Sequence, residues 1–344
     1  MKILVTGAAG QIGCGISKRL IENGHDLVLV DSLRNGYKSN LEVNGKLIAP
    51  FFNIDISKPF ALLDSKFDAI IHLAAITSLP DCEINPLETI WTNVGGVTNI
   101  LEFAKNHEIP HIIFSSTSAV YENCESDIFT ENLELNPKLY YSSSKKMAED
   151  IVESYRENYN MQITTLRFFN VFGPDGDYRR THPPLVNFLV REFLCGVSPC
   201  LSGDGTQTRD FIWVEDIISM IEICLKKKPN DTFNVCTGLN YSVNQIGKWV
   251  SEALNCNHIP LSYKPAEELW SRYPKLFDGK YALNKETVRQ ETIRKSIGSF
   301  EKAQKILEWK PNLNIEDLIK QVAVQIKNDR KQIKTFSQSL LHFS

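Results

Sequence analysis

Residues 140–146 read YYSSSKK, which places two tyrosines and two lysines within one short stretch. On a helix, residues four apart lie on one face, so Tyr141 and Lys145 would be neighbours. Tyr140 with Lys145, or Tyr141 with Lys146, is a spacing of five that turns the side chains apart. A free tyrosine has a pKa near about 10, and a nearby ammonium lowers it, so the pair suits proton abstraction from an alcohol. An incidental tyrosine and lysine at a solvent-facing helix end would show the same spacing.

A run of hydroxyl side chains favours the same chemistry. Residues 114–122 read FSSTSAVYE, and Ser115, Ser116, Thr117 and Ser118 lie at the carboxyl end of a predicted strand. Ligands bind at that edge of open α/β sheets, where a short hydroxyl bridges a substrate hydroxyl and the tyrosine. Helix capping and turn hydrogen bonds are the alternative uses of such residues, and we expect them to occupy some of these four hydroxyls.

The N-terminus predicts the first half of a dinucleotide-binding βαβ unit. It reads as a strand, KILVT, a glycine turn, GAAGQIG, an amphipathic helix, GISKRLIENG, and a second strand, DLVLVD. Gly7 permits the tight turn, Gly10 lets the backbone approach a pyrophosphate, and Gly13 allows the helix to pack closely on the strand. The free N–H groups and the positive dipole end of the helix would then face the phosphates.

The residue that ends the second strand, Asp31, indicates which dinucleotide is bound. An acidic residue there hydrogen-bonds the ribose hydroxyls of the adenosine half and repels a 2′-phosphate, which favours NAD over NADP. Arg34 lies close in the sequence and would soften that repulsion, so the preference is not absolute.

The rest of the pattern predicts an α/β fold, namely a Rossmann-type doubly wound parallel sheet with a smaller mixed α/β C-terminal substrate lobe. Further strands are predicted at 68–73, 111–116 and 162–168, and helices at 86–107 and 142–159. PLVNFLVREFLCG is predicted to be a helix, and RDFIWVEDI and TFNVCTG to be strands, the second of which returns to the sheet. The predicted NAD-binding domain is 1–172 and 208–238, the substrate-binding lobe 173–207 and 239–328, and the C-terminal tail 329–344.

Composition limits the classes of function. The 344 residues carry a formal net charge of -3, so no basic field indicates nucleic acid as a partner. The apolar stretches are too short and interrupted for a transmembrane helix, and the N-terminus does not read as a signal peptide. The eight cysteines are scattered without a CxxC pair, which predicts reduced thiols, a cytoplasmic protein and no metal site.

With these motifs in order, the chain resembles the extended short-chain dehydrogenase/reductase family, in its NAD-dependent sugar-nucleotide epimerase/dehydratase branch, and is most similar to UDP-hexose 4-epimerases. The resemblance spans about residues 2–325 and rests on VTGAAGQIG, VDSLRNG, NIDIS, HLAA, TNVGGVTNILEFA, FSSTSAVY, YYSSSKKMAE, LRFFNVFGP, GDGTQTRDFIWVED, FNVCTG and KAQKILEWKP. It implies NAD as the cofactor and a nucleotide-diphosphate sugar, most often a UDP-sugar, as the substrate. A homodimer formed through a four-helix bundle is common in such families and is expected here.

The resemblance also implies roles for single residues. Tyr141 is the base and acid, Lys145 lowers its pKa and anchors the ribose, and Thr117 supplies the bridging hydroxyl. The other implied cofactor contacts are Gly7, Gly10, Gln11, Ile12, Gly13, Asp31, Asn35, Asp55, Ile56, Leu73, Ala74, Ala75, Ser115 and, near the nicotinamide half, Asn93. The implied substrate contacts are Thr117, Asn170 near the diphosphate, Arg209 and Arg289 on the phosphates, and Ser296.

The residues after Thr117 distinguish reactions within the branch. Sugar-nucleotide 4,6-dehydratases resemble Thr-Asp-Glu there, because eliminating water needs an acid and a base beside the sugar. This chain has Ser118 and Ala119, which favours epimerisation at C4 through a transient 4-keto sugar. A 4-ketoreductase or dehydrogenase that releases NAD(P)H would use the same tyrosine, lysine and threonine. A scaffold that binds NAD without turnover is the remoter alternative.

Some positions bear on the substrate or depart from the family pattern. Members that take only plain hexoses have a tyrosine seven residues after the phosphate-binding arginine, and counting from Arg289 gives Ser296. A small residue there predicts room for an N-acetyl group at C2. RQET stands where the family usually has R-x-G followed by an acidic residue, and Glu122 and Ser142 each replace a common glycine.

Overall fold

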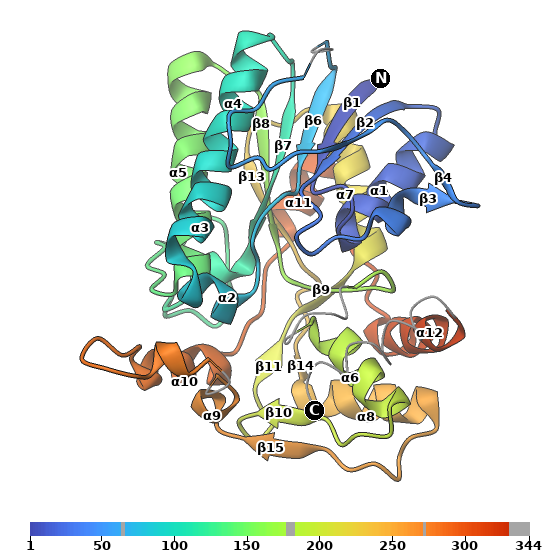
Figure 1. Ribbon diagram of the computed structural model, residues 1–344, viewed down its shortest axis with the longest axis vertical. Helices are drawn as coiled ribbons and strands as arrows, with labels where there is room; N and C mark the ends of the chain where they lie inside the picture. The colour runs from blue at the N-terminus through green and yellow to red at the C-terminus, as the bar shows by residue number, and fades with distance from the viewer. Residues whose placement is uncertain (63–65, 177–182, 271–272, 330–344) are drawn as a thin grey trace.

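The computed structural model describes residues 1–62, 66–176, 183–270 and 273–329. A seven-stranded sheet of parallel strands forms its upper part, in the order β13-β8-β7-β6-β1-β2-β5 (Figure 1). The strands are β1 (Lys2–Thr6), β2 (Asp26–Asp31), β5 (Phe51–Asn53), β6 (Ala69–His72), β7 (Ile112–Thr117), β8 (Ile163–Phe168) and β13 (Thr232–Val235). The strand order reverses between β1 and β6, which is the point where ligands bind in doubly wound sheets.

Helices cover both faces of the sheet because its strands are apolar on both sides (Figure 1). Ile3 and Val5 of β1 belong to the core cluster that includes residues of α1 and α7, whereas Leu4 belongs to the cluster with residues of α4 and α5. One side carries α1 (Gln11–Glu22), α7 (Val214–Lys227) and α11 (Glu301–Leu307). The other carries α2 (Leu79–Ile84), α3 (Pro86–Ile90), the π-helix η2 (Trp91–Gly95), α4 (Gly96–Asn106) and α5 (Tyr140–Tyr159).

A smaller lobe lies at the carboxyl edge of the sheet and has its own apolar core, formed around three helices (Figure 1). They are α6 (Leu185–Leu194), α8 (Val243–Leu254) and α12 (Ile315–Asn328). Short strand pairs complete this region: β9 (Asn170–Phe172) with β12 (Phe211–Trp213), β10 (Cys200–Ser202) with β15 (Ser262–Lys264), and β11 (Thr208–Arg209) with β14 (Tyr241–Ser242). The remaining elements are η1 (Lys38–Leu41), β3 (Glu42–Val43), β4 (Lys46–Leu47), η3 (Ser118–Tyr121), α9 (Ala266–Trp270), η4 (Pro274–Leu276) and α10 (Lys285–Ile293).

The fold class predicted from the sequence is confirmed, and one predicted strand is wrong in part. RDFIWVEDI is extended only as far as Trp213, because VEDI begins the amphipathic helix α7 and its acidic residues lie in the first turn. The predicted helix at 86–107 is broken into α3, η2 and α4. Residues 177–182 of the predicted surface loop and 330–344 of the predicted tail lie outside the described residues. The division into two domains stays a prediction.

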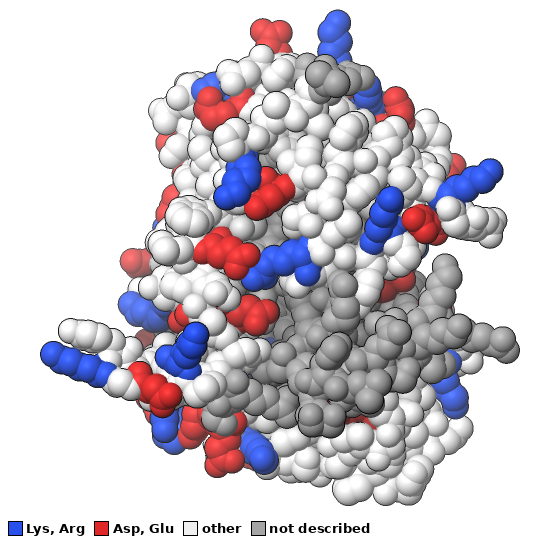
Figure 2. Space-filling view, viewed as in Figure 1, with Lys and Arg blue, Asp and Glu red and all other residues white. Residues whose placement is uncertain are grey.

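Two surface properties accompany this architecture. Acidic and basic side chains are interspersed over the described surface that Figure 2 shows, without a broad basic area. Over the ranges that the structure covers, none of the helices combines the length and the apolar character that crossing a bilayer requires.

A buried carboxylate, that of Asp210, joins the sheet to the smaller lobe. It accepts hydrogen bonds from the backbone N–H groups of Thr237, Gly238 and Gly298, at 2.9, 2.9 and 3.2 Å. The carbonyl oxygen of Asp210 also accepts from both the backbone and the side-chain amide of Asn170, at 3.1 and 2.9 Å. Because one residue ties together the ends of β9, β12 and β13, it sets how the cavity walls from the two regions face each other.

We expect Gly13→Ala to destabilise the protein strongly. A Cβ at Gly13 would lie 2.1 Å from the carbonyl oxygen of Gly7 and 2.8 Å from Ala8 Cα, which are backbone atoms that cannot turn away. Relieving this overlap should cost at least about 2 kcal/mol of the free energy of unfolding, measured by urea denaturation. Gly95→Ala is the control, since a Cβ there meets nothing within 4 Å. Equal stability of the two variants would contradict the close packing of α1 on the glycine turn.

Candidate active site

A cavity of about 1170 Å³ lies between the carboxyl edge of the sheet and the smaller lobe. It begins at the glycine turn after β1, passes the ends of β2, β6 and β7, and ends against α6, β10 and α10. Of the site residues predicted from the sequence, those that line it are Gly7, Gly10, Gln11, Ile12, Gly13, Asp31, Asn35, Asp55, Ile56, Leu73, Ala74, Ala75, Ser115, Thr117, Tyr141, Lys145, Asn170 and Arg209. Asn93, Arg289 and Ser296 do not line it.

The glycine turn leaves space for a phosphate group. Gly7 has φ +70°, and a Cβ there would lie 2.6 Å from the backbone nitrogen of Ala74, so only glycine fits. Gly10 lines the cavity, and its Cβ would make one contact, 3.4 Å from the Gly7 carbonyl, and otherwise protrude into open space. Helix α1 begins here without a side-chain cap, which leaves its first N–H groups for an anion. These features fit the pyrophosphate of a dinucleotide.

Asp31 is held rigidly at the adenosine end of this cavity. One carboxylate oxygen accepts from the backbone N–H of Ala9 at 3.0 Å and the other from that of Leu33 at 2.7 Å. Burial raises the pKa of the Asp31 carboxyl, and the two N–H groups oppose that rise. Asn35 and Asp55 line the same end. The arrangement fits the ribose hydroxyls of NAD.

Lys145 supplies a buried positive charge in the middle of the cavity wall. Its Nζ donates a hydrogen bond to the carbonyl oxygen of Ser115 at 2.5 Å and lies 4.5 Å from the centre of the Phe114 ring. Burial lowers the pKa of Lys145 to about 8, and the nearby Glu149 carboxylate opposes the shift. The amine is therefore mostly protonated at neutral pH, although it sits among buried groups.

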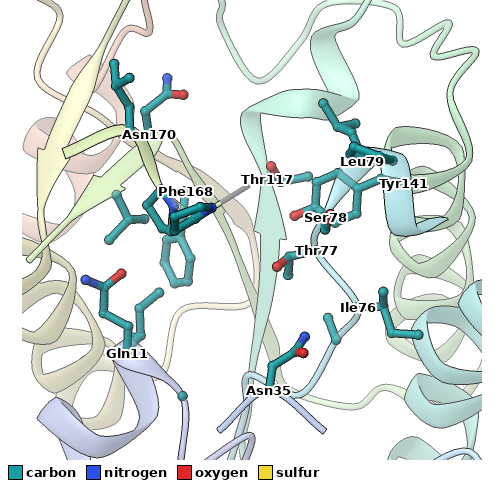
Figure 3. Close-up of a pocket in the computed structure, with 18 of the residues that line it drawn as sticks. Gln11, Asn35, Ile76, Thr77, Ser78, Leu79, Thr117, Tyr141, Phe168 and Asn170 are labelled. Carbon is teal, nitrogen blue, oxygen red and sulfur yellow. The ribbon is translucent and has the colours of Figure 1, made fainter. Parts of the chain in front are cut away.

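Tyr141 and Thr117 face the same cavity (Figure 3), and Tyr141 lies one turn of α5 before Lys145. Tyr141 comes from the first turn of α5, and Thr117 ends β7. The Thr117 Oγ1 accepts from the backbone N–H of Ala119 at 3.2 Å and so caps η3. Since a hydroxyl has both a donor and acceptors, its hydrogen is left to point elsewhere, and capping and bridging are compatible.

Two carboxylates anchor the start of α5, where Tyr141 sits. Glu122 is buried, and both of its oxygens accept from the backbone N–H of Leu139, at 3.1 and 3.3 Å. Glu83 accepts from the backbone N–H of Tyr140 at 2.6 Å, and burial raises the pKa of Glu83 to about 7. Burial raises the pKa of Glu122, and the nearby Ser142 hydroxyl opposes that rise. Glu122 and Ser142, which depart from the family pattern, thus lie together at the base of this helix.

Asn93 acts behind the cavity wall. Its side-chain oxygen accepts from the backbone N–H of Ile76 at 2.8 Å, and its amide donates to the Ile76 carbonyl at 2.9 Å. The amide also lies 3.0 Å from the Ser144 hydroxyl, next to Lys145. The π-helix η2 contains Asn93, which is fully buried, and such bulges are frequent at functional sites. Asn93 therefore fixes the loop after β6 against α5 and does not contact the cavity itself.

The smaller lobe contributes Asn170 and Arg209 to the wall, but not Arg289 or Ser296. Arg209 is partly buried and donates to the carbonyl oxygens of Glu291 and Thr292, at 2.8 and 3.1 Å. The Arg289 side chain is 54% exposed, and its guanidinium is paired with Glu267 and Glu286 outside the cavity.

Ser296 is fully buried, and its backbone N–H bonds to the carbonyl of Thr208. Its hydroxyl has no hydrogen-bond partner among the residues that the structure describes. Ser296 therefore lies behind the β11 segment that carries Arg209 instead of in the wall itself.

Sequence reasoning missed several residues that line the cavity. Thr77 and Ser78 lie in the loop after β6, on the side of Tyr141 (Figure 3). Their signal was available, since hydroxyl residues after a strand that ends HLAA are at the ligand-binding edge. Glu88 of α3 and Phe168 at the end of β8 also line the cavity, and neither has a local signal.

The geometry combines three chemical features: a phosphate cradle, a buried ammonium, and a phenol and a hydroxyl that line the same cavity. A phenol beside a fixed positive charge exchanges a proton with a secondary alcohol more readily than a phenol in water. Comparison with known proteins agrees with this reading.

The family model described as the NAD dependent epimerase/dehydratase family matches residues 3–236. A protein of Methanocaldococcus jannaschii, provisionally named UDP-glucose 4-epimerase, is 31% identical, over 96% of this chain and 99% of that protein. The crystal structure of Thermotoga maritima UDP-glucose 4-epimerase with UDP-glucose is similar with a TM-score of 0.79 and 28% identity, over 95% of this chain and 99% of that one. The Methanobrevibacter ruminantium UDP-N-acetylglucosamine 4-epimerase, in complex with UDP-N-acetylmuramic acid, has a TM-score of 0.79 and 26% identity, over 94% and 97%. The chain therefore belongs to the NAD-dependent epimerase/dehydratase family.

Proposed function

We propose that this protein inverts C4 of a nucleotide-diphosphate sugar, using NAD that it keeps through the turnover. The observation that carries the proposal is the meeting of Tyr141, Lys145 and Thr117 on one cavity that continues from the glycine turn. Family membership supports the cofactor, and the relatives named 4-epimerases support the reaction.

Each residue of the site has a defined task in this reaction. NAD, held by the glycine turn and Asp31, would supply the acceptor and donor of the hydride at C4 of the sugar. Tyr141 accepts the proton of the C4 hydroxyl and later returns it to the same oxygen, after the keto sugar has turned its opposite face to the cofactor site. Lys145, held by the Ser115 carbonyl, keeps a positive charge near the phenol and stabilises the phenolate. Thr117 donates its hydroxyl hydrogen to the substrate oxygen and so orients it.

The absence of acid and base groups after Thr117 supports epimerisation over dehydration. Ser118 and Ala119 form the buried start of η3 and carry no carboxyl group. The carboxylates that line the cavity at the substrate end, among the described residues, are Glu192 and Glu291. Each is already engaged by an arginine, Arg191 or Arg294, at 2.8 and 3.0 Å.

The substrate proposal is a UDP-sugar, with N-acetylhexosamines accepted as well as, or instead of, plain hexoses. Ser296 is small but lies behind the cavity wall, so the proposal for N-acetylated sugars rests on the sequence pattern and on the similar solved structures. The similar solved structures include enzymes named for UDP-glucose and for UDP-N-acetylglucosamine. We also propose the cytoplasm as the compartment, since all eight cysteines are free thiols.

A homodimer is proposed through the outer face of α3, η2 and α5. Leu87, Trp91 and Met147 are 67%, 57% and 47% exposed on these neighbouring elements, which lie together at one side of the molecule (Figure 1). Apolar side chains gathered on paired helices fit a second copy of the same face, which closes a four-helix bundle.

We expect Tyr141→Phe to lower kcat by roughly 10²–10⁴-fold while leaving NAD binding intact, because the substitution removes only the hydroxyl group that exchanges the proton. Turnover is measured with a UDP-sugar, and NAD is quantified after denaturing the purified protein. Tyr140→Phe is the control, since Tyr140 is 43% exposed and does not line the cavity. Near-normal turnover of the Tyr141 variant would refute the assigned base.

A panel of sugar nucleotides, incubated without added cofactor and resolved by NMR, tests the reaction and its substrate. We expect UDP-N-acetylglucosamine and UDP-glucose each to give a mixture of C4 epimers, because retained NAD is regenerated. Dependence on added NAD(P)H, with a reduced or oxidised sugar as the product, would instead identify a ketoreductase or dehydrogenase. The proposal for N-acetylated sugars is lost if none of them is converted.

Light scattering during size-exclusion chromatography should give twice the chain mass of 39.1 kDa. Trp91→Arg should give the monomer mass, because a guanidinium at the centre of the proposed bundle would be buried without a partner. Tyr281→Arg is the control, since Tyr281 is 91% exposed in the segment before α10. A monomeric parent protein would exclude the proposed interface.

A further inference from the structure

An ion pair spans the adenosine end of the cavity. Arg34 Nη2 lies 2.9 Å from a carboxylate oxygen of Glu88, and both residues line the cavity. Arg34 belongs to the segment after β2, whereas Glu88 lies in the middle of α3. The pair therefore connects two elements that come from opposite sides of the point where the strand order reverses.

The charges at this end are predominantly negative. Asp31, Asp55 and Glu88 are the carboxylates that line it, and Arg34 is the cation, among the residues that the structure describes there. Asp31 cannot turn away from a ligand, because the backbone N–H groups of Ala9 and Leu33 hold both of its oxygens. A 2′-phosphate on the adenosine ribose would need the Arg34 guanidinium to offset this charge.

We propose that Glu88 determines the preference of this protein for NAD over NADP by holding Arg34. The carboxylate engages the guanidinium and adds a negative charge of its own at the place a 2′-phosphate would enter. NAD carries no charge on that ribose, so its binding depends on Asp31 and not on the state of Arg34. Glu88 is thus a positioning residue for cofactor selection, and the inference concerns cofactor binding whatever sugar is turned over.

The exposure of the pair decides which effects to expect. The two side chains are 33% and 47% exposed, and such pairs contribute at most about 1 kcal/mol to stability. Removing Glu88 should therefore leave the fold intact. Removing Glu88 should change the affinity for a 2′-phosphate more than it changes stability. A phosphomonoester carries close to two negative charges at neutral pH, and arginine binds it through two parallel hydrogen bonds.

The test is a calorimetric titration of cofactor-free protein with NAD and with NADP at one low salt concentration. For Glu88→Gln we expect the Kd for NADP to fall by about tenfold and the Kd for NAD to change less than about threefold. Glu215→Gln is the matched control, since Arg19 and Glu215 form a pair at 2.7 Å with similar exposure, 40% and 36%, outside the cavity. It should leave both constants unchanged.

A double variant, Arg34→Ala with Glu88→Gln, separates the two parts of the proposal. Loss of the gained NADP affinity in the double variant would show that Arg34 is the group that Glu88 restrains. If the gain persists without Arg34, or if Glu88→Gln leaves the ratio of the two constants unchanged, the proposal is overturned. None of these outcomes depends on catalysis, so they remain readable even if the epimerase reaction is disproved.

Discussion

The buried ammonium of Lys145 constrains the whole site. A cation withdrawn from water is costly unless fixed groups replace its hydration, and here the Ser115 carbonyl and the Phe114 ring do so. Both groups belong to β7, whereas the lysine belongs to α5. The end of the strand and the start of the helix must therefore keep one separation, and the lowered pKa of Lys145, about 8, reflects the remaining cost of burial.

Several side chains outside the cavity maintain that separation. Asn93 ties the loop after β6 to the hydroxyl of Ser144, and Glu122 holds the backbone at Leu139, just before α5 begins. They act on the backbone on either side of Tyr141, so the direction of the phenol depends on how the start of its helix is anchored. The glycine that is common at this position in the family has no side chain to accept from the N–H of Leu139. Glu122 therefore adds a contact at the start of α5 and leaves the cavity residues unchanged.

The sequence predicted those parts of the site that depend on neighbours along the chain. The glycine turn, Asp31, the hydroxyls after β7 and the pairing of Tyr141 with Lys145 each follow from local spacing and from the rule that ligands bind at the carboxyl edge of a parallel sheet. The start of α7 was misassigned because an apolar strand runs directly into an apolar helix at Trp213, with no breaker between them.

Contacts between distant segments could not be predicted in this way. Nothing near Glu88 in the sequence indicates that it meets Arg34, because the two are brought together only when α3 packs beside the sheet. The same reason applies to Arg289, whose spacing to Ser296 follows a family pattern while its guanidinium pairs with Glu267 from α9.

The state of Arg209 shows what an incoming diphosphate must change. Its guanidinium donates to the carbonyl oxygens of Thr208, Glu291, Thr292 and Arg294, at the end of α10 and in β11. The carbonyls of the last turn of α10 carry the negative end of its helix dipole. Phosphate oxygens are also negatively charged acceptors, so they could replace these carbonyls as partners of the guanidinium. A diphosphate at Arg209, as proposed, would therefore compete with the last turn of α10 for the same donors. Since α10 also contributes Val288, Glu291 and Thr292 to the wall, binding of a diphosphate at Arg209 would be coupled to the shape of the substrate end through this one side chain.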